Sequence, residues 1–242
     1  FATVLNAHEG MTCMSIDSEI RCIAGGFRDN MVRLWTLDND TNEDDGEGEN
    51  ITQPDRSSSS HDTNGNNQNR NNKNIDVNKE GKQGALELIG HSGPIFDVDF
   101  HLAGRLIFSG GGDESVRLWD TKLTKSGYGS GCVSIYPATS AVFGVRACPL
   151  GHYFLAGCQD GSASLYSTDR NHRLRVYSGH VSDVNAVDWH PSCMLVASAS
   201  EDRSCRLWDM RTARSVRWLR GPTRGLSCIS FSPDGEKLVA GD

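Results

Sequence analysis

Two sets of side chains in this sequence contain the residue types of a serine hydrolase. Each set has a histidine, a serine, an aspartate and a tryptophan at one spacing: His91, Ser109, Asp113 and Trp119, and His180, Ser198, Asp202 and Trp208. A hydrolase exposes one nucleophile beside its base, but here the set recurs and no G-x-S-x-G elbow is present. A structural role fits better, with imidazole joining carboxylate to hydroxyl and the hydroxyl accepting the indole N–H. We therefore expect no catalytic residues and no enzymatic activity.

Two further units keep only part of the set. Their members are His8, Asp29 and Trp35 in the first unit and Asp160 and Tyr166 in the third, with Gly25, Ala138 and Ala156 at replaced positions. In all four units the aspartate stands six residues before the aromatic residue, and the aspartates follow one another at steps of 84, 47 and 42. The first step fits one repeat plus an insertion. This period is that of a WD repeat, in which ~40–45 residues form one four-stranded propeller blade.

The elements that would position these side chains read as strands. In the fourth unit, apolar runs predict strands over Val184–Trp189, Met194–Ala199 and Ser204–Trp208, separated by turn residues. A further strand precedes each Gly-His position, as at Leu86–Ile89, and Thr3–Leu5 is a similar run ahead of His8. The sequence therefore predicts an all-β fold, a WD40 β-propeller.

The repeats divide the chain into three parts. Residues 1–37 are expected to form blade 1 with a leading outer strand, 38–85 a disordered acidic, Asn-rich insertion, and 86–242 blades 2 to 5. Blade 5 begins at Gly221-Pro222, with proline in place of histidine, and its aspartate would follow residue 242. We expect about four and a half blades of a seven-bladed ring, with the remaining blades supplied by a longer native protein, because an open ring exposes strand edges.

Charge and composition exclude several classes of function. The net charge is −7, of which the segment 38–82 carries −6 and the remainder −1, so no basic surface for nucleic acid is evident. No apolar run approaches the ~18 residues of a membrane span. The eight cysteines include no C-x-x-C pair. We expect no cofactor, no metal site and no small-molecule ligand.

Certain stretches carry a more specific likeness. The strongest runs from Thr168 to Asn185 and continues in His190-Pro191 and in the run from Asp202 to Asp209. Phe1–Leu5, Gly10–Cys13, Ile23–Phe27 and Gly90–Pro94 add to it. These residues resemble the WD-repeat domain of the TFIID subunit 5 family, in which a long linker also separates repeats 1 and 2.

The resemblance implies a seven-bladed propeller in a nuclear protein. It implies a structural subunit of the general transcription factor TFIID, and of the related SAGA coactivator, that packs against histone-fold subunits in RNA polymerase II initiation. Ala138, Tyr166 and Pro222 depart from the family pattern, which puts contacts made by blades 3 and 5 in doubt.

Partner contacts are expected on one face of the propeller, three and five residues after each histidine position and one before each aspartate. The candidates are Met11, Arg28, Pro94, Phe96, Phe143, Gln159, Asp183, Asn185 and Glu201. Aromatic and arginine residues make the natural anchors, although Phe96 and Phe143 could instead pack between blades. An alternative function is a soluble adaptor that recognises a peptide or modified residue, such as a ubiquitin-ligase substrate receptor. That function would need a cluster of arginine or aromatic residues at one pore mouth.

Overall fold

The computed structural model describes residues 10–37, 85–101, 104–125 and 131–242. All of them belong to one compact unit. The expected strand Thr3–Leu5, the ring of His8 and the insertion up to residue 84 lie outside the described residues.

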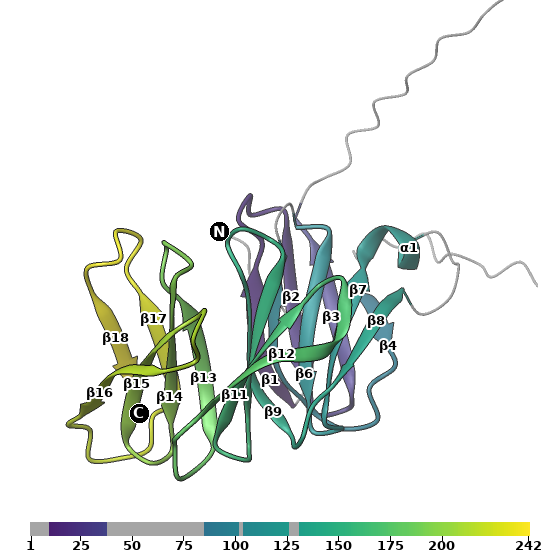
Figure 1. Cartoon of the computed structure of the whole chain (residues 1–242). Coiled ribbons are helices and arrows are strands. Elements are labelled where there is room, and N and C mark those ends of the chain that lie inside the picture. The colour runs from purple at the N-terminus through teal and green to yellow at the C-terminus, as the bar shows by residue number, and fades with distance from the viewer. Residues whose placement is uncertain (1–9, 38–84, 102–103, 126–130) are drawn as a thin grey trace, which may run out of the picture. The chain divides into compact units, whose positions relative to one another are not determined.

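Four antiparallel sheets of four strands and one of two strands make up the described unit (Figure 1). The first sheet contains β1 (Met11–Ile16), β2 (Cys22–Phe27), β3 (Met31–Thr36) and β4 (Leu86–Ile89). The second contains β5 (Ile95–Phe100), β6 (Leu106–Gly111), β7 (Ser115–Asp120) and β8 (Cys132–Pro137). A short helix, α1 (Thr121–Lys125), follows β7.

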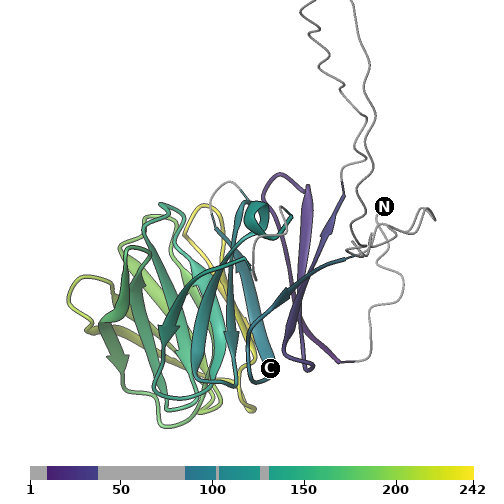
Figure 2. The same ribbon diagram turned by 90° about the vertical axis from the view of Figure 1, so that its right-hand side faces the viewer.

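The remaining sheets repeat this order. The third contains β9 (Val142–Ala147), β10 (Tyr153–Cys158), β11 (Ser162–Ser167) and β12 (Arg170–Ser178). The fourth contains β13 (Val184–Trp189), β14 (Leu195–Ser200), β15 (Ser204–Asp209) and β16 (Ser215–Arg220), and the fifth β17 (Cys228–Phe231) and β18 (Leu238–Gly241). Figure 2 shows the sheets as successive layers. The predicted all-β fold of propeller blades is confirmed.

The sheets are offset by one strand from the division of the sequence. Leu86–Ile89, which that division placed in blade 2, pairs with β3 and is the outer strand of the first sheet. The same offset recurs at β8, β12 and β16, each of which precedes the next Gly-His position or its equivalent. Each repeat therefore closes the blade before it, which ties consecutive blades together covalently and by a ladder of hydrogen bonds.

The second strand of each four-stranded sheet is buried along nearly its whole length. Such a strand needs small residues where the sheets approach most closely. At Gly110 a Cβ atom would lie 2.7 Å from Val142 and from Val145 of the next sheet, and at Gly26 it would lie 2.7 Å from Ile95. Glycine at these positions permits the close packing of blades.

Carboxylates on the innermost strands join adjacent sheets. Asp99 on β5 accepts a hydrogen bond from the backbone N–H of Ala147 on β9 (2.8 Å), and Asp188 on β13 accepts one from Phe231 on β17 (2.7 Å). Burial raises the pKa of both carboxyls, that of Asp99 to about 6, against the lowering effects of Arg146 and these bonds. The bonds satisfy backbone donors that have no other partner in the sheet.

Candidate functional site

The second sheet assembles the full polar set that its sequence predicts. Asp113 lies 2.9 Å from His91 Nδ1, His91 Nε2 lies 2.7 Å from Ser109 Oγ, and the Trp119 indole N–H donates to the same oxygen at 2.8 Å. Burial alone would raise the pKa of the Asp113 carboxyl, but the hydrogen bonds from His91 and Ser115 lower it below its ordinary value. The aspartate is therefore ionised, and because a carboxylate only accepts, Nδ1 carries a proton.

The fourth sheet repeats this arrangement. His180 Nδ1 lies 2.8 Å from Asp202, and both His180 Nε2 and Trp208 Nε1 lie 2.8 Å from Ser198 Oγ. Burial lowers the pKa of His180, opposed in part by Asp202, so the ring is neutral at pH 7 and Nε2 accepts the serine O–H. Every polar side-chain group of this His-Ser-Asp-Trp set then has a hydrogen-bond partner.

The serine of each set has no exposed surface. A nucleophile must reach its substrate, and Ser109 and Ser198 also have both their proton and their oxygen engaged by His and Trp. These groups belong to the core of their blades, where their hydrogen bonds hold the strands of one blade together.

The third sheet replaces the polar set with aromatic packing. Tyr166 stacks on Phe154 at 5.0 Å with their planes 4° apart, and Phe154 lies 4.4 Å from Phe108. The Tyr166 hydroxyl donates to Pro137 O at 3.0 Å. Asp160 accepts bonds from Thr139 Oγ1 (2.6 Å) and from the N–H and hydroxyl of Ser162. Thr139, next to the Ala138 of the histidine position, thus takes the place of the histidine, and the sequence interpretation missed it.

The first sheet has neither arrangement in its described part. Asp29 forms an ion pair with Arg33 at 2.7 Å, and Trp35 is half-buried beside Phe27, with ring centroids 6.2 Å apart. A Cβ atom at Gly25 would lie 3.2 Å from the Trp35 ring, so the indole fills the space above the glycine. His8, the remaining partner expected for Asp29, lies outside the described residues.

The predicted partner-binding positions gather at one end of the sheets. There, equivalent backbone bonds join the loop before each inner strand to the turn after the second strand: Arg28 N to Gly10 O, Gly112 N to Pro94 O, Gln159 N to Ala141 O and Glu201 N to Asp183 O, at 2.7–2.9 Å. We call this end the rim and define it by six of the nine candidates: Met11, Arg28, Pro94, Gln159, Asp183 and Glu201. Arg28, Gln159 and Glu201 are exposed, and Met11, Pro94 and Asp183 are half-buried.

The other three candidates, Phe96, Phe143 and Asn185, lie within inner strands just below the rim. Phe96 and Phe143 meet edge to face at 5.0 Å across two neighbouring blades, and both remain half-buried. With Asn185 they line a pocket of about 210 Å³ that Arg146 also borders. Asn185 donates to Leu226 O at 2.8 Å. The two phenylalanines therefore pack between blades and still offer apolar surface.

The inner-strand carboxylates also escaped the sequence interpretation. Asp99 and Asp188 each stand eight residues after the histidine of their unit. That repeated spacing was a usable signal for the bonds that join neighbouring blades.

Among the described residues, no cluster of three or more His, Cys, Asp or Glu side chains could hold a metal ion. Nor does that part of the chain contain a helix long and apolar enough to cross a membrane.

Comparisons with known proteins agree with the repeat. The family model "WD domain, G-beta repeat" matches residues 1–36, 84–120, 130–167, 171–209 and 213–242. Transcription initiation factor TFIID subunit 5 of Caenorhabditis elegans is 34% identical over 163 residues, which are 67% of this chain and 24% of that protein. The Arabidopsis thaliana protein of the same name is 33% identical over 123 residues, 51% of this chain and 16% of that protein.

A relative with another role is similar over a comparable length. The transcriptional corepressor LEUNIG_HOMOLOG of Arabidopsis thaliana is 28% identical over 152 residues, 62% of this chain and 18% of that protein. The chain thus spans about a quarter or less of these relatives. The predicted resemblance to TFIID subunit 5 is confirmed as a similarity. With its matched repeats covering most of the sequence and its sheets built as four-stranded blades, the chain belongs to the WD-repeat family of β-propeller proteins.

Proposed function

We propose that this chain is a non-catalytic scaffold that binds protein subunits of a nuclear transcription complex, as a structural component of TFIID. The observation that supports this most directly is the 34% identity to a TFIID subunit 5 over 67% of the chain. The geometry is in keeping with a scaffold: the His and Ser of its polar sets are buried and bonded, while Arg28, Gln159 and Glu201 are exposed at the rim. Histone-fold subunits are the proposed partners, and membership of SAGA is a further part of the proposal.

The rim is the proposed contact surface. It presents Arg28 and Glu201 to solvent, above the apolar faces of Phe96 and Phe143. An apolar centre with a charged edge is the usual anatomy of a protein interface. Glu201 also contacts Asn185, with Nδ2 and Oε2 3.3 Å apart, so the charge is fixed near the pocket.

Affinity capture of the full chain from nuclear extract, followed by mass spectrometry, tests the proposal. Histone-fold transcription subunits are expected among the captured proteins. Charge reversal at the rim, Arg28→Glu with Glu201→Arg, should lower their recovery several-fold, whereas Glu236→Arg, an exposed change in the β17–β18 turn at the opposite end, should not. Capture of ubiquitin-ligase components without histone-fold subunits would overturn the proposal in favour of a substrate adaptor.

A further inference from the structure

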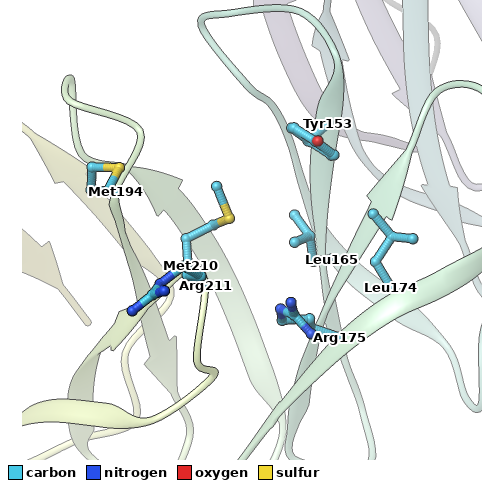
Figure 3. A pocket seen from close by; sticks show the side chains of 7 residues that line it. All are labelled: Tyr153, Leu165, Leu174, Arg175, Met194, Met210 and Arg211. Atoms are coloured by element: carbon cyan, nitrogen blue, oxygen red, sulfur yellow. The ribbon is translucent and has the colours of Figure 1, made fainter.

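A second surface lies at the opposite end of the sheets, between the third and fourth blades. A pocket of about 420 Å³ opens there, at the start of β10 and β14. Figure 3 shows Tyr153, Leu165 and Leu174 on one side, and Met194 and Met210 on the other. Met194 is 62% exposed, and its pocket neighbours Tyr153, Leu174 and Met210 pack against a buried cluster. The rim and this pocket share no residues.

The repeat supplies an internal comparison that separates what the fold requires from what this pocket adds. The bond from Met210 N to Met194 O (3.0 Å) has a counterpart between Thr168 and His152 in blade 3 and between Thr121 and Arg105 in blade 2, both at 3.1 Å. The same backbone position therefore accepts threonine opposite histidine or arginine. Two methionines occur there only in blade 4 among these three, so blade geometry does not explain them.

The charged side chains that line the pocket are all positive. Arg175 and Arg211 are exposed at its edges, and none of the seven lining residues is acidic. Neither guanidinium forms an ion pair within the described part of the chain. The nearby Asp209 carboxylate is occupied as a turn cap, accepting the N–H groups of Arg211 and Thr212 at 2.8 Å.

At the other junctions for which both equivalent positions are described, the two residues are not both positive. Between blades 1 and 2 the equivalents of Arg175 and Arg211 are Leu86 and Lys122. By strand register, Ser134 in blade 2 corresponds to Arg175, because they pair with Leu118 and Leu165 respectively. Asp169 in blade 3 corresponds to Arg211, since each follows the residue that makes the equivalent backbone bond. Single positive charges recur at these positions, as at Lys122 and Arg217. Of the three junctions compared, only that of blades 3 and 4 places two positive charges beside the apolar lining.

We propose that this pocket binds a short acidic segment of a protein partner, whose bulky apolar side chain inserts between Leu174, Met194 and Met210 while its carboxylates face Arg175 and Arg211. The flexible, polarisable side chain of methionine adapts to varied apolar groups, and guanidinium recognises carboxylate by paired hydrogen bonds. The proposal extends the scaffold function and rests on it only in taking the ligand to be a protein.

Methionine NMR with selected peptides provides the test. A display library of random short peptides is selected on the full chain, and the selected peptides are added to chain labelled with ¹³C at its five methionine methyl groups. Peptides that combine Asp or Glu with Leu, Phe, Met or Trp are expected. They should shift the signals of Met194 and Met210 and leave those of Met11, Met14 and Met31 in place.

The test uses variants that introduce the residues found at the equivalent positions of other blades. Because those residues are compatible with the blade fold, a loss of binding can be distinguished from a loss of folding. Met194→His with Met210→Thr, and separately Arg175→Ser with Arg211→Asp, should each weaken peptide binding ~10-fold or more, while Met14→Thr, an exposed methionine on β1, should not. Unchanged affinity in both pocket variants would overturn the proposal, as would selection of peptides without acidic residues, or a single-stranded oligonucleotide that shifts the same two methyl signals.

The pocket proposal and the proposed function can fail independently of each other. If peptides bind at the pocket but nuclear capture recovers no histone-fold subunits, the pocket stands and membership of TFIID fails. If histone-fold subunits are captured equally by wild-type chain and pocket variants, and no acidic peptide binds, the pocket proposal fails and the scaffold function stands.

Discussion

Blades 3 and 4 solve one packing problem in two ways. Both must hold a third strand against a second strand and close the turn between them. Blade 4 does so with hydrogen bonds that meet at Ser198, where Oγ lies 2.8 Å from His180 Nε2 and 2.8 Å from Trp208 Nε1. Blade 3 does so with a stack of aromatic rings around Phe154.

Between blade 4 and blade 3, the histidine, serine and tryptophan of the polar set are all replaced. A buried polar chain is favourable only when every member is satisfied. Without the histidine the serine hydroxyl would lose its acceptor, and without the serine the indole N–H would lose its own. Blade 3 has alanine at 156 and tyrosine at 166, whose hydroxyl donates to Pro137 O instead. Only Asp160 is retained, because Thr139 and Ser162 bond its carboxylate.

The turn that carries the aspartate is common to both blades. The residue after it adopts a left-handed backbone in each, with φ of 80° at Gly161 and 66° at Arg203. The aspartate accepts the N–H two residues ahead at 3.0 Å in both. The turn therefore needs the aspartate whichever way the rest of the blade is packed.

Truncation of the aromatic stack is the largest expected effect. Phe154→Ala should lower the free energy of unfolding by about 4 kcal/mol, because it opens a cavity at a fully buried site. Val196 occupies the equivalent position in blade 4, as the partner of Trp208, and Val196→Ala should cost clearly less. Urea denaturation followed by tryptophan fluorescence measures both. Equal costs would mean that the stack does not hold blade 3 together.

Loss of the aspartate should give the next largest difference between blades 3 and 4 in the free energy of unfolding. Asp202→Ala removes the acceptor of His180, Val181 N and Ser204 and leaves an imidazole buried without its partner, at a cost of about 3 kcal/mol. Asp160→Ala in blade 3 should cost about 1 kcal/mol, because the exposed Thr139 hydroxyl can bond water instead and no imidazole loses its partner, although the buried Ser162 loses an acceptor. A larger loss at Asp160 than at Asp202 would contradict this account.

These cases also show how far the sequence could lead. The histidine, serine, aspartate and tryptophan types at fixed spacing were enough to predict the blades, because each residue has a single role that the repeat makes visible. The offset of strands was less accessible: Leu86–Ile89 reads as a strand, but its pairing with β3 depends on a contact across the insertion.

Contacts between blades were harder still to predict. The bond of Asp99 to Ala147 and the approach of Met194 to Leu174 join residues of different repeats. A local pattern, such as the repeated spacing of Asp99 after its histidine, can mark one partner but does not identify the other. Thr139 shows a further limit. It bonds Asp160 from one position beside the expected histidine, and only the path of the backbone shows that its hydroxyl reaches the carboxylate.

Installing one polar group in blade 3 tests whether the set is exchanged as a unit. Ala156→Ser alone should cost about 1–2 kcal/mol, because it buries a hydroxyl with no histidine or indole beside it. Adding Ala138→His and Tyr166→Trp should recover part of that loss, although the aromatic stack is disturbed. Strict additivity of the three changes in urea denaturation would show that the positions are independent.

The smallest expected effect is a pH dependence that only the polar blade has. Burial lowers the pKa of His180, so the folded chain holds its proton less readily than the unfolded chain, whose histidine titrates near 6.5. Unfolding therefore takes up a proton as the pH falls through this range, and the contribution of His180 to stability is full above about pH 7 and declines toward pH 5. The pKa of Asp202 is also lowered, because the bonds from Ser204 and His180 outweigh its burial, and acts in the same direction at more acidic pH.

A difference measurement isolates this effect from the inner-strand carboxyls, such as Asp99, whose raised pKa acts in the opposite direction. The gap in unfolding free energy between wild type and His180→Gln should narrow as the pH is lowered from about 7 to 5. The same comparison for Ala138→Gln in blade 3 should show a gap that does not change with pH, because no imidazole is present at that position. If the gap at His180 widened on acidification, the ring would be charged in the folded blade, and the neutral hydrogen-bond chain assigned to it would be wrong.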